Sequence, residues 1–241
     1  SYRAAQGKIK ATVRMMAATQ GKLRFDVVSP FDTPLATLVT SSGRFSLVDA
    51  QKNRHFHGPA TPCNISRLLR VQLRPEDVLT ILGGATPLIP HVKRSLRWDD
   101  RAGVEILTLV NKKGTTQTVR LDGRDRRWKL LTSRIHDAKG KLLLELHAGE
   151  HKKLAGLDLP RQLKVRQPAQ KAELELDFKR QEINIELPKI AFELPSSGGL
   201  SSQYVDCGTQ VVLGGKLPPK AAKKNTAPTS QAAPAPAPGA K

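Results

Sequence analysis

The sequence predicts a mainly β fold of about eleven antiparallel strands, with two short α-helices lying across the sheet as a cover. Apolar and polar residues alternate in many segments, which is typical of strands with one buried face. Turn signals recur roughly every 8–12 residues, as in sandwiches and barrels rather than in βαβ units. The chain contains no internal repeat.

The first strands lie ahead of residue 50. We expect them over residues 8–15, 23–27, 35–40 and 44–49. Ser29-Pro30 ends the second of these strands. Ser41-Ser42-Gly43 is a short connection between the third and the fourth, which favours a hairpin.

Two helices are predicted next. Ile65, Leu68 and Leu69 have helical spacing, and Asn64 before them is a candidate N-cap. Pro75 suits the first position of a second helix, whose apolar face contains Val78, Leu79, Ile81 and Leu82. Gly83-Gly84 ends this helix.

Strands resume after the helices and continue to residue 187. We expect them over residues 92–98, 104–110, 117–121, 128–135, 141–147, 162–166, 171–179 and 183–187. Residues 104–110 are nearly all apolar, so we expect both faces of that strand to be covered. The Ala- and Pro-rich sequence from Lys216 to Lys241 cannot form a core. We therefore predict a folded domain over residues 1–215 and a disordered tail over residues 216–241.

The net charge of +19 favours an anionic partner, although strands exposed to water also carry Lys and Arg without a specific partner. Five lysines of the tail account for part of it and leave +14 on the body. The basic residues are not interleaved with stacking aromatics, so we expect no nucleic acid. No run of 18 apolar residues occurs, which argues against a transmembrane helix.

Cys63 and Cys207 are the two cysteines. An even count in an exported chain favours a disulfide, and the alternative is two free buried thiols. Neither cysteine lies in a CxxC or beside a histidine at ligand spacing, so we expect no zinc. His55 and His57 share one strand face, where a solvent-facing pair is favoured over a metal site. No nucleophile motif appears, and we predict neither an enzyme nor a cofactor.

Four segments carry a family resemblance: SPFDTPLATLVTSSGRFSLVD at 29–49, GPATP at 58–62, LRPEDVLTILGG at 73–84 and NIELPKIAFELPSSGGL at 184–200. They resemble the LolA/LolB superfamily of periplasmic lipoprotein carriers, and LolB-like outer-membrane lipoproteins in particular. The resemblance spans residues 2–200. It implies a strongly curved antiparallel sheet, a half-barrel, with helices over its mouth and an apolar cavity for acyl chains.

The resemblance also implies a set of apolar cavity and lid residues. They are Phe25, Val27, Leu38, Phe45, Leu47, Leu68, Leu69, Val78, Leu79, Leu82, Ile106 and Leu144. By composition alone these residues would form an ordinary core. Burial of an acyl chain among them would contribute about 0.8 kcal/mol per methylene.

The expected function is non-enzymatic binding of a lipid or lipoprotein acyl chain, at the periplasmic face of the outer membrane or in the periplasm. The alternative is a structural or interaction protein of the envelope that binds anionic partners, such as a membrane surface, through its basic residues. LolB-type proteins have a protruding loop with an apolar tip, whereas the hairpin taken to correspond, Ser41-Ser42-Gly43, is polar. The chain begins at Ser1 and lacks the anchoring cysteine of a lipoprotein, so we interpret it as a mature or trimmed form.

Overall fold

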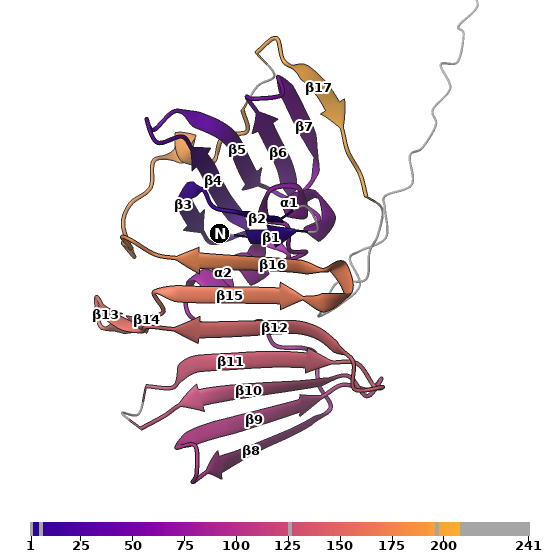
Figure 1. Ribbon diagram of the computed structural model, residues 1–241, viewed down its shortest axis with the longest axis vertical. Coiled ribbons are helices and arrows are strands. Elements are labelled where there is room, and N and C mark those ends of the chain that lie inside the picture. The colour runs from indigo at the N-terminus through magenta and orange to yellow at the C-terminus, as the bar shows by residue number, and fades with distance from the viewer. Residues whose placement is uncertain (1, 5–6, 125–126, 196–197, 208–241) are drawn as a thin grey trace, which may run out of the picture.

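The computed structural model describes residues 2–4, 7–124, 127–195 and 198–207, and the predicted tail from Lys216 to Lys241 lies outside them. The described strands form a nine-stranded sheet, a six-stranded sheet and a separate two-stranded hairpin (Figure 1). We call the first two the large sheet and the small sheet. The expected mainly β architecture with two helices is confirmed.

In spatial order, the large sheet contains β2 (Gly7–Ile9), β1 (Tyr2–Ala4), β16 (Ala172–Asp177), β15 (Gln162–Gln167), β12 (Leu142–Gly149), β11 (Lys129–His136), β10 (Thr116–Asp122), β9 (Val104–Val110) and β8 (Lys93–Asp99). The small sheet contains β17 (Ser201–Tyr204), β7 (Arg54–Pro59), β6 (Arg44–Asp49), β5 (Pro34–Ser41), β4 (Lys22–Val28) and β3 (Thr12–Ala18). The hairpin consists of β13 (Lys152–Leu154) and β14 (Leu157–Leu159). The β17–β7 pair is parallel, and the other pairs are antiparallel.

The number of strands and their division between sheets differ from the expectation. The described residues form seventeen strands rather than about eleven, because several strands have only three or four residues. The single strand expected over residues 8–15 is interrupted at Lys10 and Ala11, which leave β2 at the edge of one sheet and β3 at the edge of the other. The described strands close no barrel, and the half-barrel is not confirmed.

The two helices begin at prolines. Thr61 caps α1 (Pro62–Leu69) by accepting a hydrogen bond from the backbone N–H of Asn64. The prediction of Asn64 as the N-cap was wrong, because this side chain instead donates to the carbonyls of Pro59 and Val205. Pro75 begins α2 (Pro75–Leu82) as expected, and the helix ends before Gly83.

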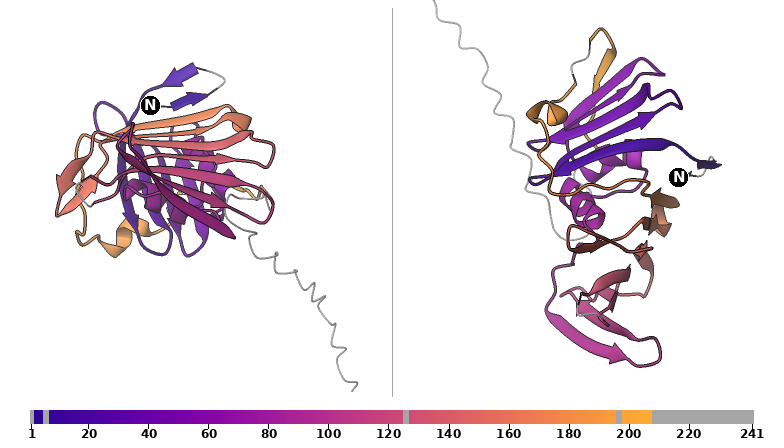
Figure 2. Two further views of the ribbon diagram at one scale, coloured as in Figure 1. Left: turned by 90° about the horizontal axis from the view of Figure 1, so that it is seen from below. Right: turned by 90° about the vertical axis from the view of Figure 1, so that its left-hand side faces the viewer.

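One core joins both sheets to both helices. We call the face of each sheet that is turned toward this core its inner face. Ile65 of α1 and Val78 of α2 are buried together with Phe25 and Leu38 of the small sheet and Leu146 of the large sheet. The helices lie behind the end of the large sheet that contains β15 and β16 (Figure 1), whereas β8 to β10 extend beyond them (Figure 2). The inner face of the large sheet is therefore covered unevenly.

Residues 183–187 form no strand, which corrects the expectation. Their alternation resembles that of a strand, but β16 is already paired with β15 and β1. The chain instead crosses to the outer face of the small sheet, where the short helix η2 (Lys189–Phe192) contacts β4 and β5. Ala191 and Phe192 are buried there.

Cys63 and Cys207 form a disulfide, so the bridge expected from the sequence is confirmed. It joins the first turn of α1 to the segment after β17, across 144 residues. In the entropy model of crosslinking, a loop of this length stabilises the fold by about 4–5 kcal/mol.

Candidate functional site

Most of the predicted cavity residues lie together. Phe25, Leu38, Phe45, Leu47, Leu69, Val78 and Leu144 belong to the core, and Leu68 and Leu82 pack against it while partly exposed. Val27 and Leu79 are half-buried and lie outside this cluster. Ile106 is buried on the opposite face of the large sheet from Leu107 and Leu109, because neighbouring residues of a strand alternate between faces.

The core under the helices is tightly closed. Phe25, Leu38 and Phe45 expose 2% or less of their surface. In this conformation, protein side chains therefore fill the space in which an acyl chain is expected from the sequence. Two hollows, of about 170 and about 440 Å³, lie elsewhere, and each is lined by a mixture of apolar, polar and charged residues.

Accessible apolar surface occurs where the large sheet extends past the helices. Leu96 and Trp98 of β8 are 62% and 48% exposed. Leu96 pairs with Leu107 of β9, whose side chain packs against the core, so Leu96 lies on the same inner face. This open inner face, defined by Leu96, Trp98 and Leu107, is contiguous with the core but not covered by the helices.

A second tryptophan lies beside this surface. Trp98 pairs with Glu105 of β9, and the indole nitrogen of Trp128 donates a hydrogen bond to the Glu105 carboxylate. Trp128 is also largely exposed. Both tryptophans of the chain thus gather around one glutamate at the far end of the large sheet.

An exposed aromatic tip lies on the small sheet. Phe31 is 90% exposed in the connection between β4 and β5. The hydroxyl of Ser29 accepts hydrogen bonds from the backbone N–H groups of Phe31 and Thr33, which holds this loop in a turn. The sequence interpretation gave Phe31 no role because it considered only the polar Ser41–Gly43 hairpin; an aromatic between Pro30 and Asp32 in a turn was the available signal.

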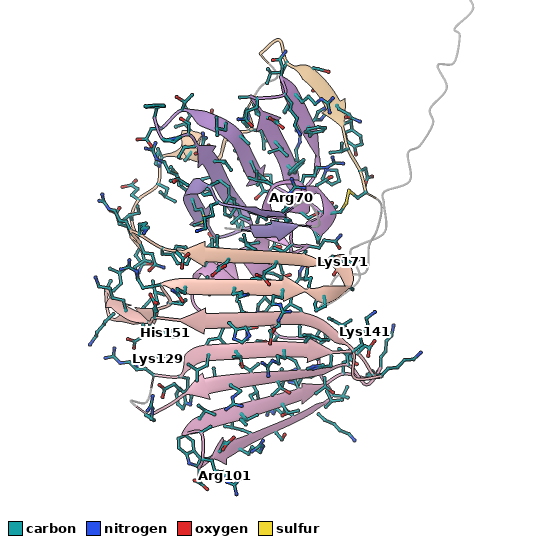
Figure 3. The ribbon with its side chains drawn as sticks, viewed as in Figure 1. Arg70, Arg101, Lys129, Lys141, His151 and Lys171 are labelled. Carbon is teal, nitrogen blue, oxygen red and sulfur yellow. A yellow bond between two sulfur atoms is a disulfide. The ribbon has the colours of Figure 1, made fainter. Side chains whose placement is uncertain are left out.

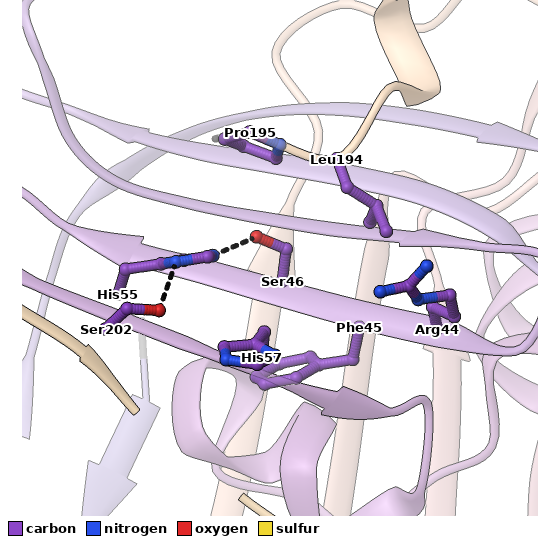
Figure 4. A pocket seen from close by; sticks show the side chains of 8 residues that line it. All are labelled: Arg44, Phe45, Ser46, His55, His57, Leu194, Pro195 and Ser202. Carbon is purple, nitrogen blue, oxygen red and sulfur yellow. Dashed lines mark hydrogen bonds between the residues drawn. The ribbon is translucent and has the colours of Figure 1, made fainter. Parts of the chain in front are cut away.

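The smaller hollow lies on the outer face of the small sheet (Figure 4). His55 lies between the hydroxyls of Ser46 and Ser202, at 2.9 and 3.1 Å from its two ring nitrogens. Burial, and then the neighbouring His57, lower the pKa of His55 below its ordinary value. The expectation of a solvent-facing pair is therefore wrong for His55, which is buried beside Ser202 of the neighbouring strand β17; the two histidines do share one face, with ring centroids 5.4 Å apart.

The larger hollow lies on the outer face of the large sheet, among paired charges. Glu145 accepts hydrogen bonds from Arg134 at 2.7 Å and Arg166 at 3.0 Å. Burial raises the pKa of Glu145, but hydrogen bonds from Arg134 and His147 outweigh it and hold the pKa below its ordinary value. Lys164 pairs with Glu173 at 3.2 Å. Lys164 and Arg166, which line the hollow, therefore already have anionic partners within the sheet.

Comparison with solved structures decides the fold. The chain is similar to a LolA superfamily protein from Nitrosomonas europaea, with a TM-score of 0.51 and 10% identity over 80% of this chain and 86% of that one. It is also similar to a domain named for outer membrane lipoprotein sorting, from Vibrio parahaemolyticus, with a TM-score of 0.50 and 16% identity over 78% and 83% of the two chains. The chain has a LolA/LolB-like fold. No protein-family model and no curated protein matches its sequence.

Two further features concern metal ligands and membrane-spanning helices in the described part of the chain. No group of three or more His, Cys, Asp or Glu side chains in the described part of the chain could hold a metal ion. None of the described helices is long and apolar enough to cross a membrane. Leu96, Trp98 and Phe31 are among the large apolar residues that are exposed to solvent.

Proposed function

We propose that the protein binds the acyl chain of a lipid or lipoprotein, without catalysis, in the periplasm or at the periplasmic face of the outer membrane. The observation that carries this proposal is the open inner face, where Leu96 and Trp98 expose apolar surface contiguous with the core. Exposed apolar surface of this kind marks binding sites in folded proteins. The names of the two similar structures support the proposal for lipoprotein sorting.

An acyl chain on the open inner face would gain about 0.8 kcal/mol for each methylene that it buries. Leu96 and Leu107 would contact the chain, and the indole of Trp98 would cover one side of it. Such a site needs no charged group for affinity, because apolar contact alone holds a long chain. The binding would therefore be passive and reversible.

The helices provide a route for deeper binding. Leu68 and Leu82 are partly exposed and lie against the core, so a displacement of α1 and α2 would uncover the predicted cavity residues. We propose that an acyl chain first contacts the open inner face and then extends under α2. The closed core would be the ligand-free conformation.

Phe31 gives the protein a means of touching a membrane. A phenyl ring that is 90% exposed on a short turn can enter the interfacial region of a bilayer. We propose that this tip brings the protein to the membrane from which it takes, or to which it delivers, an acyl chain.

The closed core supports one alternative function. A structural or interaction protein of the envelope would have the same filled interior and would bind anionic partners through its basic surface. It would have no affinity for acyl chains. The two functions are therefore separated by a binding measurement.

The test is titration of the protein with a fluorescent fatty-acyl probe. We expect saturable binding, and we expect Leu96→Asp to weaken it at least tenfold because a carboxylate opposes acyl burial. Leu157→Asp is the matched control, since Leu157 is 52% exposed on β14 and should bind as the parent does. Equal binding by all three proteins, or none by the parent, would contradict the proposal.

A further inference from the structure

We infer that the free edge of β8 binds an extended polypeptide segment in which acidic and apolar residues alternate. The segment would add to the large sheet as a tenth strand. This inference goes beyond acyl binding, because it concerns a protein partner and depends on the backbone edge and the outer-face cations of β8. The inference does not depend on the proposed lipid binding and would stand if that proposal were wrong.

The first observation is the edge itself. β8 is the last strand of the large sheet and pairs with β9 alone among the described strands. Every side chain from Lys93 to Trp98 is exposed. An edge strand of seven residues presents unpaired backbone N–H and C=O groups, and addition of a strand is the common way in which an extended peptide uses them.

The second observation is the difference between the two faces of β8. Leu96 and Trp98 point to the inner face, beside Leu107 and Glu105. Lys93 and Arg97 point to the outer face. A strand added to this edge would meet Leu96 and Trp98 on the inner face, with Arg94 beside Leu109 at one end, and Lys93 and Arg97 on the outer face. An alternation of apolar and acidic residues is the pattern that satisfies both faces.

The third observation is that the cations are unpaired. Lys93, Arg94, Arg97 and Arg101 make no ion pair with any residue that the structure describes. Figure 3 shows Arg101 at the far end of the large sheet, in the turn that follows β8. Elsewhere on the same sheet, Arg134 and Arg166 are paired with Glu145. The cations of β8 and of the turn after it are therefore available to an acidic partner.

The geometry favours an added strand over two other partners. A bilayer would have to contact Leu96 and Arg97 together, but these side chains point to opposite faces of the strand. A second copy paired through β8 would bring like charges together, which is unfavourable across a strand pair. Lysines and arginines also protect an edge from aggregation, but protection does not explain the exposed Leu96 and Trp98.

The experiment uses the whole protein and three synthetic nine-residue peptides. One alternates Glu and Leu, one has the same composition with the glutamates grouped together, and one alternates Lys and Leu. We expect binding of the first peptide only. Hydrogen exchange should slow at the backbone amides of β8 when it binds, because an added strand pairs with that edge.

A charge reversal then tests the outer face. The double variant Lys93→Glu/Arg97→Glu should bind the Glu-Leu peptide about tenfold more weakly and should gain binding of the Lys-Leu peptide. This gain also shows that the variant is folded. The control Lys139→Glu/Lys141→Glu makes the same change in net charge in the turn between β11 and β12, which are three and four strands from β8 in the sheet, and should bind as the parent does.

Several results would overturn the inference. The charge-reversed variant could keep the parent's preference among the peptides, or the peptide with grouped glutamates could bind as tightly as the alternating one. Hydrogen exchange at the backbone amides of β8 could stay unchanged on binding, or the protein could form dimers through β8. Capture by anionic phosphatidylglycerol vesicles, lost in the same variant, would assign the surface to a membrane instead. The acyl probe should bind the charge-reversed variant normally, so failure of either proposal is distinguishable from failure of the other.

Discussion

His55 and Gly58 show how single residues hold β17 on the small sheet. The ring of His55 joins Ser46 of β6 to Ser202 of β17. Gly58 lets the chain approach closely, since a Cβ there would lie 2.1 Å from the carbonyl oxygen of Val205. The Cys63–Cys207 disulfide closes the same junction. Three different interactions therefore fix one late segment.

The lowered pKa of His55 predicts a pH dependence of stability. In the unfolded chain this imidazole takes up a proton near its ordinary value of 6.5, whereas in the folded protein it does so only at lower pH. The unfolded state therefore gains protons first as the pH falls through 6.5, and stability is lost. We expect His55 to contribute at most about 1.4 kcal/mol per pH unit to this loss.

Thermal melts of the parent and of His55→Gln between pH 7.5 and 5.5 measure this contribution. The glutamine can still bond both serines but does not titrate, so its melting temperature should fall less steeply. Equal slopes for the two proteins would show that His55 does not carry the effect.

Some residue-level features follow from local sequence and others do not. The cysteine pair and Pro75 could be predicted, because each depends on residue type and neighbours. The burial of His55 could not, because Ser202, which covers it, lies 147 residues away. Asn64 was misjudged for the same reason: one of its two acceptors is the distant Val205.

At the scale of elements, α2 is the part of the fold on which the lipid proposal depends most. Val78 is 5% exposed in the core, whereas Leu82, one turn later, is only partly buried. Substitutions at these two positions therefore distinguish two interpretations of α2: a helix that only closes a core, and a helix that covers a ligand site.

Substitution by aspartate tests this difference. Val78→Asp places a charge in the sealed core and should cost about 3 kcal/mol or more of unfolding free energy. Leu82→Asp should cost less and leave a folded protein that no longer binds the acyl probe. Thermal melts and one probe titration measure both effects. A folded Leu82→Asp protein that binds like the parent would exclude α2 as a lid, and an unfolded one would favour the packed-core alternative.

Most of the early strands could be predicted, because apolar and polar residues alternate where one face of a strand is buried. Residues 23–27, 35–40 and 44–49 form strands as expected. Residues 183–187 alternate in the same way, but both edges of β16, the strand before them, are already paired with β15 and β1, so the pattern did not produce a strand. β17 was not expected, because its four exposed residues carry no alternation of buried and exposed positions.

At the scale of the whole molecule, the large sheet is longer than the helices that cover it. The strands near α1 and α2 bury their inner face, and β8 leaves it open (Figure 2). The sequence could predict which residues are apolar but not which part of the inner face the helices would reach. That limit explains why the predicted cavity residues include side chains of the closed core and do not include the exposed Leu96 and Trp98.

The measurement that tests the central claim most directly uses the two tryptophans of the chain. In a Trp128→Phe variant, Trp98 is the sole tryptophan and lies on the open inner face. Titration with a fatty acid that carries a nitroxide quencher on its acyl chain should quench Trp98 fluorescence saturably, and Leu96→Asp in the same background should abolish the saturable part. Absence of saturable quenching in the folded Trp128→Phe protein would contradict acyl binding at this face.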